Sequence, residues 1–256
     1  MEMDKAFYVK VQNQIKEANK ILGIGIGWKV ATSGEKVILS VLKQHISPPY
    51  CVFDVGSNIG QFLNLILNNL QDIQIHCFEP NPLSFNKLTK TVANLDTNEI
   101  IKLNNKAISS NKGYSSLFYD KDCSELSSLT KRRLDHFNIF MNKEETVCID
   151  TIDSYCDINN ITRINLLKLD IEGYELDALC GASNMFENKL IDMVTFEFGG
   201  CNIDTRTFFQ DYWYFFKEIK FKLFRITQTN YLHHVDTYRE LDEQFVTTNF
   251  IAIKDI

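Results

Sequence analysis

The chain has 256 residues, of which 45% are hydrophobic and 23% are charged, as in an ordinary soluble globular protein. Its net charge of -6 argues against nucleic acid or an anionic membrane as the main partner, and no apolar run is long enough to span a bilayer. Seven cysteines without a Cys-X-X-Cys pair, and a polar start without a signal-peptide pattern, predict free thiols and a cytoplasmic location.

Residues 1–50 predict an N-terminal helical extension. Loosely periodic apolar residues favour helices over 6–21 and 37–46. The glycines of 23–27 resemble a nucleotide-binding loop, but they follow a helix and not a strand. We therefore expect an ordinary loop between the two helices.

From residue 51 onward, strands and helices alternate. We expect strands at 51–55, 73–78, 100–103, 164–169 and 192–196, helices at 61–67, 84–95, 176–181 and 208–219, and a closing pair of strands at 221–226 and 249–253. This order predicts one α/β domain over 1–256 with a Rossmann-like, doubly wound, mostly parallel sheet and an antiparallel closing strand.

Residues 109–146 interrupt this alternation with a polar, serine-rich segment. Long irregular insertions in compact domains are usually lids or binding loops, so we expect a lid above the ligand edge of the sheet. A short helix near 129–137 and a short strand at 147–149 are the regular elements we expect around it. The cluster Lys131-Arg132-Arg133 could meet the phosphates of a nucleotide-linked sugar, although we favour a solvated surface.

Polar residues follow directly after each predicted parallel strand. They are Asp54 to Gly60, Glu79, Asn105, Lys168 to Glu172, and Glu197. Ligands of doubly wound sheets lie beyond the carboxyl ends of the strands, so these residues predict one shared site.

The turn between Asp54 and Gly60 predicts the cofactor class. Gly56 and Gly60 allow a sharp turn and a close approach of the backbone to a ligand. Asn58 stands where a dinucleotide site would need a second glycine, which disfavours a nicotinamide dehydrogenase. Glu79 lies about 20 residues further on, where a carboxylate can accept both ribose hydroxyls of an adenosine. We therefore expect an adenosyl ligand without phosphates.

Lys168, Asp170 and Glu172 alternate at one strand end, so on an extended backbone they would face one side together. Glu197 from the neighbouring strand could join them. One carboxylate could take the proton of a hydroxyl group, with Lys168 orienting it. The alternative is an ion-pair network that only shapes the pocket. No histidine stands at a ligand spacing beside these acids, so we expect no metal, although three carboxylates could hold Mg²⁺.

Two other clusters could bind a ligand, but we favour a structural role for each. His233-His234 is a weak zinc pattern, because adjacent side chains point different ways, and we expect a surface loop. The aromatic run 212–216 could stack on a sugar ring, but packing in the core or between subunits is the interpretation we favour.

Three stretches together resemble the FkbM family of S-adenosylmethionine-dependent methyltransferases. These are Asp-Val-Gly-Ser-Asn-Ile-Gly at 54–60, Cys-Phe-Glu-Pro-Asn-Pro at 77–82 and Leu-Lys-Leu-Asp-Ile-Glu-Gly-Tyr-Glu at 167–175. The resemblance covers about residues 51–200, and the third stretch is the most specific of the three.

The resemblance implies a class I methyltransferase-like fold, S-adenosylmethionine as cofactor and S-adenosylhomocysteine as product. It implies that Asp54, Gly56, Ser57, Asn58 and Gly60 hold the methionine portion, that Glu79 binds the ribose, that Asn105, Lys106 and Ala107 flank the adenine, and that Asp170 and Glu172 line the site of methyl transfer.

The function that follows is O-methylation of a sugar hydroxyl, on a nucleotide-activated sugar or a capsular or surface polysaccharide precursor. The alternatives are methylation of another small-molecule hydroxyl, such as one on a polyketide, and a non-catalytic nucleotide-binding module. The chain could form a homodimer.

Overall fold

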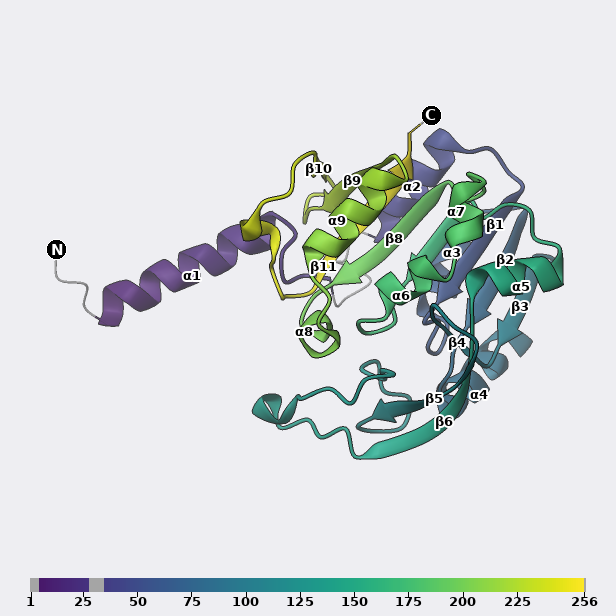
Figure 1. Ribbon diagram of the computed structural model, residues 1–256, viewed down its shortest axis with the longest axis horizontal. Coiled ribbons are helices and arrows are strands. Elements are labelled where there is room, and N and C mark those ends of the chain that lie inside the picture. The colour runs from purple at the N-terminus through teal and green to yellow at the C-terminus, as the bar shows by residue number, and fades with distance from the viewer. Residues whose placement is uncertain (1–4, 28–34, 256) are drawn as a thin grey trace.

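The computed structural model describes residues 5–27 and 35–255 and shows a large twisted sheet between helices (Figure 1). In this part of the chain the sheet has eight strands in the order β10-β9-β11-β8-β7-β1-β2-β3. Their bounds are Tyr50–Val55 (β1), Ile73–Phe78 (β2), Ile100–Asn104 (β3), Leu166–Leu169 (β7), Met193–Phe198 (β8), Phe221–Ile226 (β9), Leu232–His234 (β10) and Thr248–Lys254 (β11).

The central strands β1, β2, β3, β7 and β8 pair in parallel, whereas β11 runs antiparallel between β8 and β9. The predicted doubly wound sheet with an antiparallel closing strand is therefore confirmed. Because the parallel strands share a direction, all their carboxyl ends meet at one edge of the sheet.

The described ranges contain helices on both faces of the sheet, and one helix, Lys5–Ile21 (α1), that projects away from it (Figure 1). The others are Glu35–His45 (α2), Gln61–Leu67 (α3), Pro82–Ala93 (α4), Ile152–Asn159 (α5), Glu175–Cys180 (α6), Ser183–Glu187 (α7), Cys201–Thr205 (α8) and Phe209–Glu218 (α9). Buried residues of α2, α3 and α4 pack on one face, and those of α5, α6, α7 and α9 pack on the other.

Alternation along β1 separates these two cores. Val52 belongs to the cluster under α2 to α4, and Phe53 to the cluster under α5 to α9, as expected for successive residues of a strand. Both side chains are fully buried, so β1 forms the centre of the molecule.

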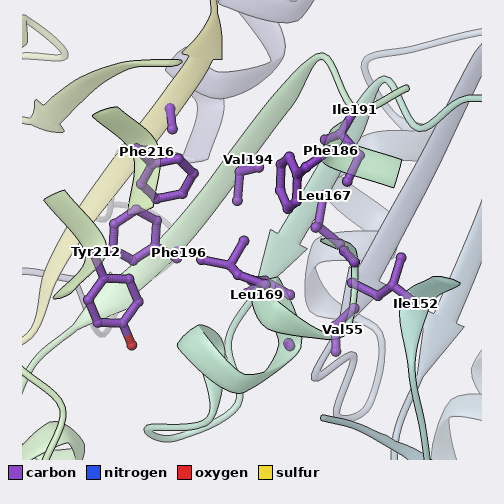
Figure 2. Close-up of a cluster of buried hydrophobic side chains, with 14 of the residues drawn as sticks. Val55, Ile152, Leu167, Leu169, Phe186, Ile191, Val194, Phe196, Tyr212 and Phe216 are labelled. Carbon is purple, nitrogen blue, oxygen red and sulfur yellow. The ribbon is translucent and has the colours of Figure 1, made fainter. Parts of the chain in front are cut away.

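Three residues of the aromatic run on α9, Tyr212, Trp213 and Phe216, pack inside the second core, as we favoured, whereas Tyr214 is exposed. Figure 2 shows Tyr212 and Phe216 of α9 beside Phe196 of β8. The rings of Phe196 and Tyr212 are stacked with centroids 4.8 Å apart, and those of Phe196 and Phe216 lie 5.4 Å apart. This part of the chain thus supports the sheet and does not line a site.

The insertion is more regular than its sequence predicts. A second sheet, ordered β4-β6-β5, is formed by Ala107–Ile108 (β4), Gly113–Tyr119 (β5) and Lys143–Asp150 (β6), and it curves away from the main sheet (Figure 1). The expectation of an irregular segment is wrong for these strands, and the helix expected at 129–137 is only the short 3-10 helix Asp135–Phe137 (η1).

Two features explain why the sequence does not predict this second sheet, namely the exposure of β6 and the long connection between β5 and β6. Most residues of β6 are exposed, so the strand lacks an apolar pattern. β5 and β6 pair along their length but are joined by 23 residues without a short hairpin turn, so no turn signal marks the pair.

Glycines 23–27 form a loop, as expected. The N–H groups of Gly25 and Gly27 donate to the Thr247 carbonyl at 2.9 and 3.3 Å, so this loop fastens the end of α1 to the strand side of the molecule. A second 3-10 helix, Glu240–Asp242 (η2), lies in the segment before β11. None of the helices in the described ranges has the length and apolar character needed to cross a membrane.

Candidate active site

The glycine turn after β1 is held against the ends of both neighbouring strands. The N–H groups of Gly56 and Ser57 donate to the Phe78 carbonyl at the end of β2, at 2.9 and 3.0 Å. Gly56 has a φ of +87°, and a Cβ there would lie 1.9 Å from the carbonyl oxygen of Asp170. Only glycine permits both this conformation and this approach. The turn is therefore fixed at the point where β1, β2 and β7 end together.

Asp54, near the end of β1, is a fully buried carboxylate. Neither of its oxygens has a hydrogen-bond partner among the described residues, but the Nζ of Lys168 lies 3.3 Å from Oδ1. The same Nζ lies 3.3 Å from Oδ2 of Asp170 and 5.2 Å from the centre of the Phe62 ring. Asp54 and Lys168 are register partners of β1 and β7. Lys168 thus links the acid before the glycine turn to the acid after β7.

Glu79 follows β2 and faces the same turn. Its carboxylate accepts the N–H of Asn58 and the N–H of Asn81, each at 2.8 Å and each on a different oxygen. Burial raises the pKa of Glu79 to about 7, although these two hydrogen bonds act in the opposite direction. Each carboxylate oxygen can accept a second hydrogen bond, so Glu79 retains the capacity to bind hydroxyl groups.

The three residues predicted to flank an adenine lie after β3. Asn105 donates through Nδ2 to the carbonyl oxygen of Glu79 at 2.8 Å and braces the loop after β2. Lys106 pairs with Asp150 at 2.9 Å, at the base of the second sheet. Ala107 is buried in β4. Of the three, Asn105 is the residue in direct contact with Glu79.

The loop after β7 begins at Asp170, whose side chain is 45% exposed. Beyond it the backbone leaves the extended conformation, because Glu172 adopts a φ of +54°. The buried carboxylate of Glu175 accepts the N–H of Ile171 at 2.9 Å and so stabilises this tight loop. Asp170 lies beside Lys168, but the expectation that Glu172 shares the same face of an extended strand is wrong.

Glu197, on β8, completes the carboxylate group. It lines a small cavity of about 20 Å³ together with Lys168 and Asp170. Burial raises the pKa of Glu197 well above its ordinary value, and the charge of Asp170 adds to the effect. Burial therefore disfavours the charged form of Glu197, which is the form that a base needs.

A larger groove of about 380 Å³ lies elsewhere, along α5 and α7. Its lining includes Asp153, Asp157 and Asn184 and none of the residues predicted for the site. Because ligands of doubly wound sheets bind at the carboxyl edge, the small cavity is the better candidate despite its size.

Arg132 is a candidate site residue whose contact with a predicted site acid the sequence did not indicate. It is 9% exposed, its guanidinium contacts the Glu172 carboxylate, and its Nε lies 3.5 Å from Oδ2 of Asp204. The favoured solvated surface is therefore wrong for Arg132, whereas the neighbouring Arg133 is exposed and pairs with Asp135. Nothing in the spacing of this basic cluster singles out its middle residue.

Two more hydrogen bonds fasten the insertion above the carboxyl edge. The Ser128 hydroxyl donates to the Glu172 carbonyl at 2.9 Å. At the other end, the Asn58 side-chain amide donates to the Ser124 carbonyl at 3.4 Å. The insertion therefore reaches from the glycine turn to the loop after β7.

Burial and charge together fit a cationic adenosyl ligand. S-adenosylmethionine carries a positive sulfonium and an ammonium group, and both would be attracted to this carboxylate-rich edge. The buried oxygens of Asp54 that lack hydrogen-bond partners among the described residues could accept from such a ligand. Glu79 has the chemistry needed to bind ribose hydroxyls.

A metal ligand set is not found in the described ranges 5–27 and 35–255, where no group of three or more His, Cys, Asp or Glu side chains is placed to hold an ion. His233 and His234 lie on the edge strand β10 and not in the loop that we expected. The ring of His234 lies 5.0 Å from that of Phe224, so it packs against β9.

Two curated proteins are similar to this chain in sequence. The 2-O-methyltransferase NoeI of Sinorhizobium fredii is 23% identical over 188 residues, which cover 70% of this chain and 76% of NoeI. The hexuronic acid methyltransferase AglP of Haloferax volcanii is 25% identical over 164 residues, which cover 63% of this chain and 62% of AglP. The chain thus spans less than two thirds of AglP.

Among solved structures, a TehB-like methyltransferase from Corynebacterium glutamicum matches with a TM-score of 0.43 and 9% identity, over 97% of this chain and 96% of that one. Similarity at this level is too low to inform the function. In contrast, residues 54–223 match the methyltransferase FkbM domain. Because this match covers more than half of the chain, the protein belongs to the FkbM family of S-adenosylmethionine-dependent methyltransferases.

Proposed function

We propose that the protein transfers a methyl group from S-adenosylmethionine to a sugar hydroxyl, on a nucleotide-activated sugar or a capsular or surface polysaccharide precursor. The similarity to a 2-O-methyltransferase and to a hexuronic acid methyltransferase supports this acceptor class. Its seven free thiols fit action in a reducing compartment such as the cytoplasm.

The cofactor would rest on the glycine turn. Asp54, Gly56, Ser57, Asn58 and Gly60 would hold its methionine portion, Glu79 its ribose, and Asn105, Lys106 and Ala107 would flank its adenine. When bound, the cofactor supplies a methyl group attached to a cationic sulfur. The protein has to orient the acceptor behind that methyl group and exclude water.

Asp170 is the strongest candidate for the base that takes the hydroxyl proton. It is the most exposed of the predicted catalytic acids, whereas Glu172 is engaged by Arg132 and Glu197 has a raised pKa. Lys168 lies within ion-pair distance of Asp170 and would orient its carboxylate.

The observation that carries the proposal is the position of Lys168. Its Nζ lies 3.3 Å from Asp54 and 3.3 Å from Asp170, so one side chain joins the predicted cofactor turn to the predicted base. The exposure of Asp170 supports a role toward an acceptor.

The test is methyl transfer to two acceptor sets, nucleotide-linked sugars and oligosaccharide fragments, followed by mass spectrometry of the products. We expect one methyl group per acceptor, retained after mild alkali, because a methyl ether resists hydrolysis. An alkali-labile product would show esterification of a sugar carboxylate instead. Transfer only to a polyketide-like hydroxyl would contradict the sugar assignment, and cofactor binding without transfer to any acceptor would favour a binding module.

A further inference from the structure

Helix α1 carries an apolar stripe that the methyl-transfer site does not use. None of its described side chains is buried. Apolar residues recur at alternating intervals of three and four along one side, namely Tyr8, Val11, Ile15, Ala18 and Leu22. The N–H of Leu22 donates to the Ala18 carbonyl at 3.1 Å, so the helical path continues to the last of them. An interval of 3.5 residues is the spacing of a coiled-coil seam.

The described part of its own chain leaves most of this stripe exposed and Val11 partly exposed. Tyr8 is 51%, Ile15 56% and Leu22 46% exposed. The end of the helix is fastened through buried Ile24 and the bond from Gly25 to the Thr247 carbonyl. Figure 1 shows α1 projecting from this point away from the sheet. An exposed seam on a projecting helix is available to another molecule.

The positions of the charged residues on α1 discriminate between a membrane and a second helix as its partner. The lysines Lys10, Lys16 and Lys20 lie off the stripe, and the positions that border it between residues 8 and 22 are uncharged, at Gln12, Gln14, Asn19 and Ile21. A helix that lies on an anionic membrane gains from lysines next to its apolar side. Two identical helices that pair along a seam gain from borders without like charges.

We infer that α1 is a dimerisation helix that pairs with α1 of a second copy of this chain along the Tyr8–Leu22 seam. The seam offers five apolar positions, one of them the small Ala18. A contact this short predicts a reversible dimer that dissociates on dilution and not a permanent one. The inference is independent of the proposed acceptor.

Sedimentation equilibrium tests it with two matched variants of the full chain. Ile15→Asp places a charge in the middle of the seam, and Val9→Asp places the same charge at an exposed position off the seam, since Val9 is 44% exposed. At chain concentrations up to about 100 μM, we expect wild type and Val9→Asp to approach twice the chain mass of 29.7 kDa. We expect Ile15→Asp to remain monomeric, with its dimer dissociation constant raised at least about tenfold.

Three outcomes would overturn the inference. These are a monomeric wild type throughout this range, a dimer that survives Ile15→Asp, and a monomer that co-sediments with phosphatidylglycerol vesicles through the same stripe. Far-UV circular dichroism and binding of S-adenosylhomocysteine confirm that each variant is folded, and they keep this result separate from the methyl-transfer proposal.

Discussion

Two buried cations each serve two acids in this protein, and they reach the site by different routes. Lys168 contacts Asp54 and Asp170 from within the central sheet. Arg132 contacts Glu172 and Asp204 from the insertion. Lys168 is placed by strand register, whereas Arg132 is placed by a long excursion of the chain that is fastened by polar contacts. The contacts of Lys168 belong to the core of the sheet. We call the contacts of Arg132 with Glu172 and Asp204 the latch, because they hold the insertion to the loop after β7.

The difference has an energetic basis. Asp54 is fully buried, and Lys168 lies within ion-pair distance of it, so removal of Lys168 would leave this acid buried without its cation. The side chains of Glu172 and Asp204 are 15% and 14% exposed, which leaves them some hydration without Arg132. Removal of Lys168 should therefore lower the free energy of unfolding more than removal of Arg132.

The largest effect on activity is expected at Asp170, the exposed acid that pairs with Lys168. Asp170→Asn removes the proposed base and should lower kcat by about 10²–10⁴-fold, while binding of S-adenosylhomocysteine changes little. Steady-state kinetics with the best acceptor measure this. Asp157→Asn, an exposed acid on α5, is the matched control and should leave kcat unchanged. Equal kcat in the Asp170 variant and wild type would exclude the base assignment.

The core pair is broken by Lys168→Met, which leaves Asp54 charged and buried. We expect a loss of about 3–5 kcal/mol in the free energy of unfolding, measured by urea denaturation. Adding Asp54→Asn removes the stranded charge and should restore most of that stability but not the activity. A Lys168→Met variant as stable as wild type would contradict a stabilising ion pair between Lys168 and Asp54.

The latch is opened by Arg132→Leu, with Arg133→Leu as the exposed control beside it. We expect a smaller loss of about 1–2 kcal/mol, because the raised pKa of Glu172 lets it take up a proton when Arg132 is absent. Proteolysis should then cut within residues 120–142 faster in Arg132→Leu than in Arg133→Leu. Equal cleavage of both variants would mean that Arg132 does not hold the insertion closed.

The smallest effect concerns pH and the proposed ribose site. Glu79 has a pKa of about 7 in the folded protein, so below that pH it is increasingly protonated. If the charged form accepts the ribose hydroxyls, the affinity for S-adenosylhomocysteine should fall by up to about tenfold per pH unit below 7 and level off above about pH 8. Calorimetric titration across this range measures it. A pH-independent affinity would contradict the role of Glu79.

Most of the sheet edge could be predicted from the sequence. Strand register brings Asp54 opposite Lys168, and short apolar runs ending in polar residues marked these strand ends. The contact between Lys168 and Asp170 follows from their spacing on a strand. These features are local, or depend on one regular pairing.

The latch could not be predicted, because it depends on contacts between residues distant in the chain. Arg132 reaches Glu172 across 40 positions, through an insertion whose strands carry mostly polar side chains. The position of Glu172 depends on a turn that the buried Glu175 stabilises, and a carboxylate in this role has no sequence pattern of its own. Burial of a charged residue is decided by its partners, which an isolated sequence does not reveal.

The most direct test of the account is a titration of S-adenosylhomocysteine into Glu79→Gln and Asp170→Asn, with turnover measured on the same samples. We predict that Glu79→Gln loses at least about tenfold in affinity, whereas Asp170→Asn binds within about threefold of wild type and loses turnover. Unchanged affinity in Glu79→Gln, or full turnover in Asp170→Asn, would contradict a cofactor on the glycine turn with the base at the end of β7.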